Sequence, residues 1–268
     1  MSLGFWPPQA ARYATVDLGH DEDGRLVLTY ERCASSANAS CKFLRDDLDG
    51  RRSSFRGLAP ANCELSTAPA LWRGRAAYGL LCLKGRSEDT ARSGLYVKQR
   101  GRAPRQLPLK QRVVPFGVTN VTAVDLRGTR VAALAAGGAA EVALTETVAG
   151  RGVRSFVAAD SEGDTGQSAS GARLGAGGTL WTLTDTEHLD DPLQSTIKRL
   201  TGACLDFDTL VSSAGAQPPS GFRASDLAVD GRSLYLVVPG AGIVSHTFTP
   251  SRLCGGAGNT ETIVTLAG

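Results

Sequence analysis

The sequence predicts an all-β fold, a single β-propeller of five blades with four antiparallel strands in each blade. Three observations predict it. A β-rich run, a glycine turn and a more apolar run recur five times, at residues 14–30, 66–82, 122–136, 170–184 and 225–238. The turn glycines are 50, 54, 50 and 53 residues apart, a period typical of propeller blades. Glycine is abundant, at 32 of 268 residues, and no window has the apolar period of an amphipathic helix.

Each repeat is expected to open with a hairpin, because glycine adopts the positive φ of a tight turn without a Cβ clash. The turn glycines are Gly24, Gly74, Gly128, Gly178 and Gly231. A third run of alternating polarity follows at 42–45, 95–99, 141–145, 196–200 and 243–248, and a fourth around 53–58, 105–109, 153–158, 205–211 and 260–266. We therefore expect blades at 10–58, 59–109, 110–161, 162–214 and 215–268. A β-sandwich is the alternative, although its strands need not recur at fixed intervals.

The fifth hairpin contains the run Asp-Gly-Arg-Ser-Leu-Tyr-Leu at residues 230–236, and the first contains Asp-Gly-Arg-Leu-Val-Leu at 23–28. These runs resemble the D-G-x-x-L-Y element of TolB-like, WD40-like propeller repeats. The resemblance implies the fold alone, because that superfamily contains scaffolds, inhibitors, receptors and enzymes. No run that would latch the ring is visible, since the first and last units begin and end with the chain.

Six cysteines predict three disulfides, for which fifteen pairings exist. Cys63 and Cys82 lie almost symmetrically about the turn at Gly74, which would place them opposite each other in an antiparallel pair. The other two predicted bonds are Cys33–Cys41, across a short loop, and Cys204–Cys254, between equivalent loops of blades four and five. Disulfides predict an extracytoplasmic location: secreted, periplasmic or cell-surface. The absence of a C-x-x-C motif argues against a metal site, and we expect no cofactor.

The N-terminal residues lack the basic start and apolar stretch of a signal peptide. We therefore expect a signal to have been removed and residues 1–9 to be a tail that comes in part from cloning. No apolar run approaches the ~20 residues of a membrane-spanning helix. The 24 Arg against 5 Lys, with abundant Ala and Gly, are typical of a GC-rich bacterial genome.

No nucleophile elbow, Walker loop or H-E-x-x-H motif is present. Aligning the first strand of each blade places Asp17, Asp125 and Arg173 in one column, with Asp226 close by. If this column faces the central channel, these four residues are candidates for ligand binding. Asp17 and Asp125 would be the carboxylates of a carbohydrate hydrolase. The alternative is a charge-balanced ring that is purely structural.

One basic tract extends from Lys84 to Arg112 and is opposed only by Glu88 and Asp89. Its cations are Lys84, Arg86, Arg92, Lys98, Arg100, Arg102, Arg105, Lys110 and Arg112. Such a tract predicts contact with a polyanion, such as a cell-wall polymer. It lacks Phe and Trp, which argues against nucleic acid because bases have no ring on which to stack. The alternative is an edge strand that charge protects from aggregation.

These observations favour a secreted or envelope-associated, non-catalytic propeller that serves as a binding or scaffolding module. Its partner would be an unidentified protein or glycan, and we expect a monomer. The hydrolase with carboxylates at the channel is the alternative function.

Overall fold

The computed structural model describes residues 11–34, 41–55, 57–107, 120–137, 140–160, 165–188, 194–201, 204–210, 226–230, 233–238, 242–248 and 264–265. The fold of these residues is all-β, as predicted, and their one helical turn is the 3-10 turn Ala176–Gly178. Nothing helical within these ranges reaches the length and hydropathy that a membrane span requires.

The described strands form four sheets that follow the chain, and we treat the two halves of the first, ten-stranded sheet as sheet 1 and sheet 2. Sheet 1 contains β1 (Ala11–His20), β2 (Leu26–Ala34), β3 (Cys41–Asp47) and β4 (Arg51–Ser54). Sheet 2 contains β6 (Ala70–Trp72), β7 (Arg75–Lys84), β9 (Gly94–Gln99) and β10 (Arg105–Gln106), and β5 (Cys63–Leu65) and β8 (Ser87–Glu88) also pair with β7. Sheets 1 and 2 are joined by one parallel pairing, between His20 and Trp72.

The remaining sheets repeat this antiparallel order. Sheet 3 contains β11 (Asn120–Arg127), β12 (Arg130–Gly137), β13 (Ala140–Thr147) and β14 (Arg154–Asp160). Sheet 4 contains β15 (Thr165–Leu174), β16 (Leu180–His188), β17 (Gln194–Thr201) and β18 (Cys204–Leu210). The strands described in sheet 5 are β19 (Asp226–Asp230), β20 (Ser233–Val238) and β21 (Gly242–Thr247).

The predicted hairpin turns are confirmed in the first four sheets. Gly24, Gly74, Gly128 and Gly178 have φ values of +81°, +77°, +63° and +75°, the left-handed region that favours glycine. Gly231 lies outside the described residues. The local turn chemistry therefore sets the position of each of these four hairpins.

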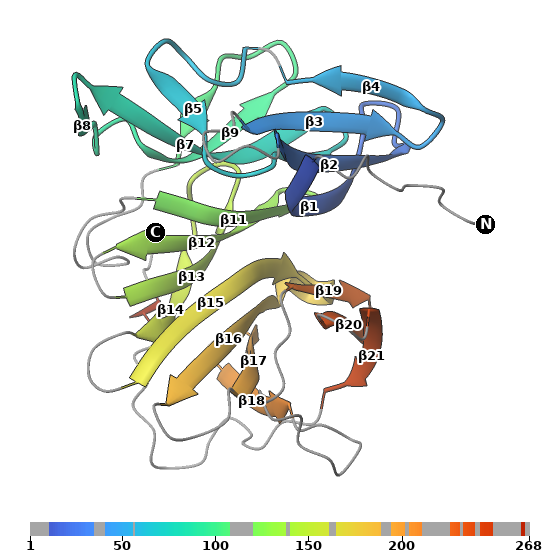
Figure 1. The fold of residues 1–268 in the computed structure, drawn as a ribbon, viewed down its shortest axis with the longest axis vertical. Helices are drawn as coiled ribbons and strands as arrows, with labels where there is room; N and C mark the ends of the chain where they lie inside the picture. The colour runs from blue at the N-terminus through green and yellow to red at the C-terminus, as the bar shows by residue number, and fades with distance from the viewer. Residues whose placement is uncertain are drawn as a thin grey trace.

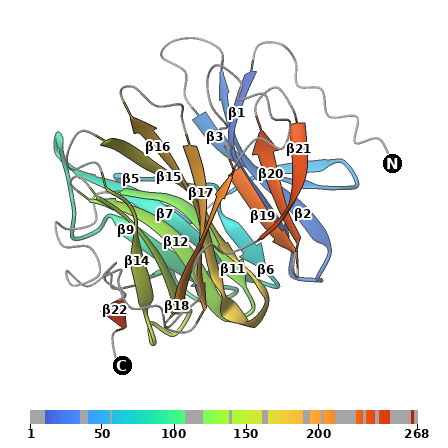
Figure 2. The same cartoon turned by 90° about the horizontal axis from the view of Figure 1, so that it is seen from below.

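The end of the chain differs from the expected arrangement. The short strand β22 (Val264–Thr265), which lies in the run expected to be the fourth strand of blade five, pairs with β14 at the edge of sheet 3 (Figure 2). Two residues of β-forming sequence can join any open edge, so their sequence carries little information about their partner.

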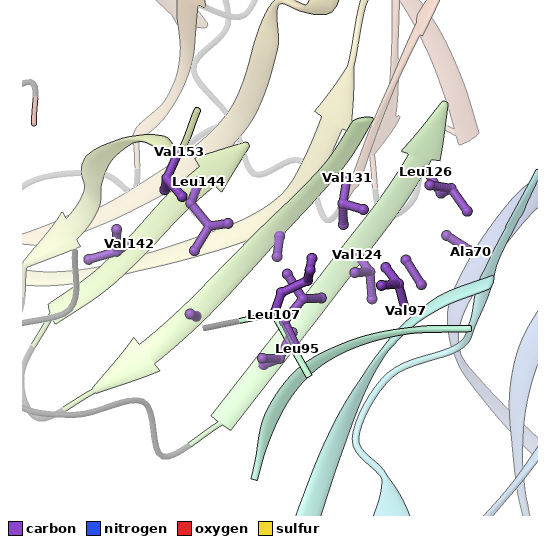
Figure 3. Close-up of a cluster of buried hydrophobic side chains, with 14 residues drawn as sticks. Ala70, Leu95, Val97, Leu107, Val124, Leu126, Val131, Val142, Leu144 and Val153 are labelled. Atoms are coloured by element: carbon purple, nitrogen blue, oxygen red, sulfur yellow. The ribbon is translucent and has the colours of Figure 1, made fainter. Parts of the chain in front are cut away.

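Neighbouring sheets pack face to face through apolar side chains. Figure 3 shows the cluster between sheets 2 and 3, which contains Leu95 and Val97 of β9, Val124 of β11 and Leu144 of β13. Similar clusters join sheet 3 to sheet 4 and sheet 4 to sheet 5. Each fully buried Leu contributes about 1.5–3 kcal/mol relative to an exposed one. Burial between sheets is therefore the main force that orders them.

The sheets succeed one another around the molecule in chain order (Figure 1). Sheet 1 is blue, sheet 3 is green and sheet 5 is red in that view. The described strands contain no ladder between sheet 5 and sheet 1. The described strands thus form an all-β arrangement of sheets in succession, and they do not by themselves form a closed ring.

Candidate functional site

Two residues of the predicted channel column are brought together between sheets 3 and 4. Oδ2 of Asp125 on β11 accepts a hydrogen bond of 2.7 Å from the backbone N–H of Leu174 on β15. The neighbouring Arg173 donates from Nε to the backbone carbonyl of Leu227 on β19, at 3.0 Å. These contacts connect the first strands of sheets 3, 4 and 5.

Burial raises the pKa of Asp125, and the guanidinium of Arg173 opposes that rise. A buried carboxylate beside a guanidinium and a backbone N–H is a charge-balanced contact between sheets. Asp17 lies half-buried on β1, where it pairs with Thr29 of β2. Asp226 is on β19, and its side chain lies outside the described part of the structure.

The predicted disulfide between Cys63 and Cys82 is confirmed, and it joins β5 to β7 at directly opposed positions. Cys33 and Cys41 are likewise opposed in the ladder between β2 and β3. Cys204 is disulfide-bonded, while its predicted partner Cys254 lies outside the described residues.

A basic pocket of about 500 Å³ lies where sheets 2 and 3 meet, at the end of sheet 2 where β9 turns into β10. Its described lining combines four cations with short apolar and polar side chains, and no carboxylate is among the described residues that line it. These residues are Arg75, Val97, Lys98, Gln99, Arg102, Ala103, Arg105, Val148 and Ala149. We call it the basic pocket.

Three of the four cations are held by backbone carbonyls. Arg75 donates to Gly128 at 3.1 Å and Lys98 donates to Gly57 at 3.1 Å. Arg105 donates to the carbonyl of Val148. The Arg102 side chain is exposed, and none of the four cations forms an ion pair with a carboxylate in the described ranges. The pocket therefore offers charged donors that carbonyls position but do not neutralise.

A second pocket, of about 350 Å³, adjoins the first because Arg75 and Lys98 line both. We call it the mixed pocket, since its lining includes carboxylates, cations, hydroxyls and apolar groups. Its lining residues are His20, Asp21, Glu22, Arg45, Ser53, Ser54, Phe55, Leu58, Leu71, Gly74, Arg75, Ala76, Lys98, Arg100 and Gly101. Among the described residues, no group of three or more His, Cys, Asp or Glu side chains is placed so that it could hold a metal ion.

Asp21 is fixed in the mixed pocket. Its Oδ1 accepts hydrogen bonds from the backbone N–H groups of Asp23, at 2.9 Å, and Arg25, at 2.8 Å. Its Oδ2 lies 3.6 Å from the Arg45 guanidinium. Burial acts to raise the pKa of Asp21, but these N–H groups and Arg45 outweigh burial and lower it. Asp21 is therefore a fixed carboxylate at neutral pH.

The fold is similar to that of a solved structure. It is the crystal structure of a protein of unknown function from Dyadobacter fermentans, which superposes with a TM-score of 0.55 at 11% identity. The match covers 98% of this chain and 84% of that chain. No protein-family model matches the sequence, and no curated protein matches it. At this identity the likeness shows the fold alone.

The basic pocket contains part of the predicted basic tract. Lys98, Arg102 and Arg105 line it, whereas Lys84 lies at the opposite end of the ten-residue strand β7. Lys110 and Arg112 lie outside the described residues. Arg75 was not predicted from the sequence, although its place directly after the turn glycine Gly74 puts it at the same end of the sheet as the pocket.

Proposed function

We propose that this chain is an extracytoplasmic, non-catalytic binding module that holds an anionic ligand in the basic pocket. The observation that carries the proposal is the set of four cations around a cavity of about 500 Å³, with no carboxylate among the described residues of its lining. Cavities of roughly 300–1,000 Å³ are typical of ligand sites. Guanidinium and ammonium groups form strong charge-assisted hydrogen bonds with carboxylate, phosphate or sulfate oxygens.

The proposed scaffold is a single five-bladed propeller of the TolB-like, WD40-like class. Its support is the succession of sheets 1 to 5 in chain order, of which sheets 1 and 2 are halves of one ten-stranded sheet, with apolar clusters between sheets 2 and 3, 3 and 4, and 4 and 5. First strands also contact one another in order, from β11 to β15 and from β15 to β19. In this arrangement sheet 5 would pack against sheet 1 and complete the ring.

The disulfide between Cys63 and Cys82 supports export, because such bonds persist in oxidising compartments. The contacts of Asp125 support a non-catalytic role. Its carboxylate binds the Leu174 N–H across a sheet interface, and neither Asp17 nor Asp125 lines the two pockets described above. A carbohydrate hydrolase that used these carboxylates would lose glycan hydrolysis in Asp17→Ala and Asp125→Ala variants.

The test is calorimetric titration of the intact chain with tripolyphosphate, for the wild type and for an Arg102→Glu variant. Arg102 is exposed, and its side chain forms no hydrogen bond or ion pair with the part of the chain that the structure describes. Charge reversal beside a bound anion costs about 1 kcal/mol for each unit of charge at ~4 Å in water, so we expect roughly thirtyfold weaker binding.

Arg86→Glu is the matched control. Arg86 lies in the turn after β7, roughly 30 Å along the strand from Arg75, well beyond the Debye length of ~8 Å at physiological salt. Its reversal should leave the dissociation constant within twofold. No binding by the wild type, or equal weakening in both variants, would refute the proposed site.

A further inference from the structure

The basic and mixed pockets adjoin at one end of sheet 2, and we call the two together the groove. Arg75 and Lys98 stand at their junction. The groove extends from the turn after β13, at Val148, to the turn after β1, at Glu22. A ligand that binds in the basic pocket therefore has room to continue toward sheet 1.

The charge of the groove changes along its length. All the charged groups among the described residues that line the basic pocket are cations. In the mixed pocket, beyond the shared Arg75 and Lys98, two carboxylates, Asp21 and Glu22, accompany the two cations Arg45 and Arg100. A ligand with uniform negative charge, such as polyphosphate or an acidic peptide, would bring its anions against these two carboxylates. The groove matches a ligand that is anionic at one end and neutral, but rich in hydroxyls, at the other.

The mixed pocket also has the surfaces that a sugar ring requires. Phe55, Leu71 and Ala76 supply apolar contact, and Ser53 and Ser54 supply hydroxyls. Sugar hydroxyls both donate and accept hydrogen bonds, so carboxylates and guanidiniums in one pocket can bind the same ring. Asp21 is ready for this role because backbone N–H groups occupy its Oδ1 and hold the side chain in place.

We propose that the groove binds an acidic oligosaccharide, with an anionic sugar in the basic pocket and a neutral sugar in the mixed pocket. This inference rests on the proposed function, since the anionic sugar occupies the site assigned there. It adds the class of ligand and the direction in which the ligand lies.

The test compares the response of two anions to Glu22→Gln. Glu22 is exposed in the turn after β1, so the exchange leaves the fold intact. For a hyaluronan tetrasaccharide, which alternates glucuronate with a neutral amino sugar, we expect about fivefold weaker binding, because a charged acceptor for hydroxyls is lost. For tripolyphosphate we expect binding that is unchanged or about twofold tighter, because a repulsive charge is removed.

Three comparisons complete the experiment. Asp23→Asn is the matched control, because Asp23 lies in the same turn but outside the lining of the groove, and it should change neither affinity. Phe55→Leu should weaken the tetrasaccharide and leave tripolyphosphate unaffected. Neutral chitotetraose should bind at least tenfold more weakly than the hyaluronan tetrasaccharide, since it has no group for the basic pocket.

The outcomes separate the two proposals. If the tetrasaccharide responds to Arg102→Glu but not to Glu22→Gln or Phe55→Leu, the extended groove is wrong and the anion site stands. The extended groove is also wrong, and the anion site again stands, if tripolyphosphate binds and the tetrasaccharide does not. If neither anion binds in a manner that depends on Arg102, both proposals fail.

Discussion

Removal of the disulfide between Cys63 and Cys82 should measurably destabilise the protein. The two residues are separated by 19 positions, and the bond closes a loop that contains the hairpin of β6 and β7. Closing a loop of this length lowers the entropy of the unfolded chain, which in the chain-entropy model raises the free energy of unfolding by about 3 kcal/mol. For a domain of this size, that loss corresponds to a fall of roughly 6–12 °C in Tm.

The assay is urea unfolding of the wild type, of Cys63→Ala and of the double variant Cys63→Ala/Cys82→Ala. Cys82 is fully buried beside Tyr78 and Leu80, so the single variant breaks the cross-link and leaves the buried sulfur in place. We expect most of the loss in the single variant and a small further loss in the double variant. A single-variant loss below about 1 kcal/mol would refute the reasoning from loop closure.

Three further predictions concern sheet packing. Burial raises the pKa of Asp125, so its protonated form stabilises the fold at acid pH, and this contribution is lost as pH rises above the unfolded pKa of ~3.9. The stability of Asp125→Asn relative to wild type should therefore increase from pH 4 to pH 7 in denaturant titrations. A difference that stays constant with pH would contradict a raised pKa for Asp125. Gly79→Ala should destabilise the fold by about 1–3 kcal/mol, because a Cβ at this position would lie 2.2 Å from Ser66 Oγ. Unchanged thermal stability would show that Ser66 and its neighbours can move away without cost. Tyr78→Phe should cost about 1–2 kcal/mol in the same assay, because the buried carbonyl of Leu58 loses a donor at 3.1 Å, and a neutral result would mean that water replaces the hydroxyl.

The hairpins could be predicted because their signals are local. A turn glycine needs positive φ whatever surrounds it, and four of the five predicted turn glycines lie in the described structure with that conformation. The apolar run after each turn became β2, β7, β12, β16 or β20, and β12 and β16 pack on both faces between neighbouring sheets.

The outer strands were less predictable. β10 has two residues and β4 has four exposed ones, so neither has a buried face to impose a pattern. β5 and β8 both pair with β7, and their sequences contain no separate signal. The partner of β22 depends on which sheet edge is open in three dimensions, and that information is absent from its two residues.

The basic pocket could be predicted only in part, because residues from two sheets line it. Lys98, Arg102 and Arg105 are close in sequence and were found as a tract of charge. Arg75 comes beside them through the pairing of β7 with β9 inside sheet 2, and Val148 only through the packing of sheet 3 on sheet 2. The channel column shows the converse. The sequence alignment of the blades placed Asp125 and Arg173 in the same column, and the two residues do interact. Asp125 is buried, however, so the pair forms a contact between sheets.

The arginines of this chain take part both in the packing of the sheets and in the proposed binding of an anion. Arg75 and Arg154 donate to the carbonyls of the turn glycines Gly128 and Gly178 in the next sheet, at 3.1 and 3.4 Å. Sheet ladders leave turn carbonyls such as these without a strand partner, and a guanidinium with five N–H donors can satisfy one and retain the others. Arg75 and Arg105 do this at the junction of sheets 2 and 3, where they also line the basic pocket. An anion bound there would accept hydrogen bonds from the remaining N–H groups of side chains that are already fixed to sheet 3. The contacts that hold the two sheets together would therefore also preorganise the site for its ligand.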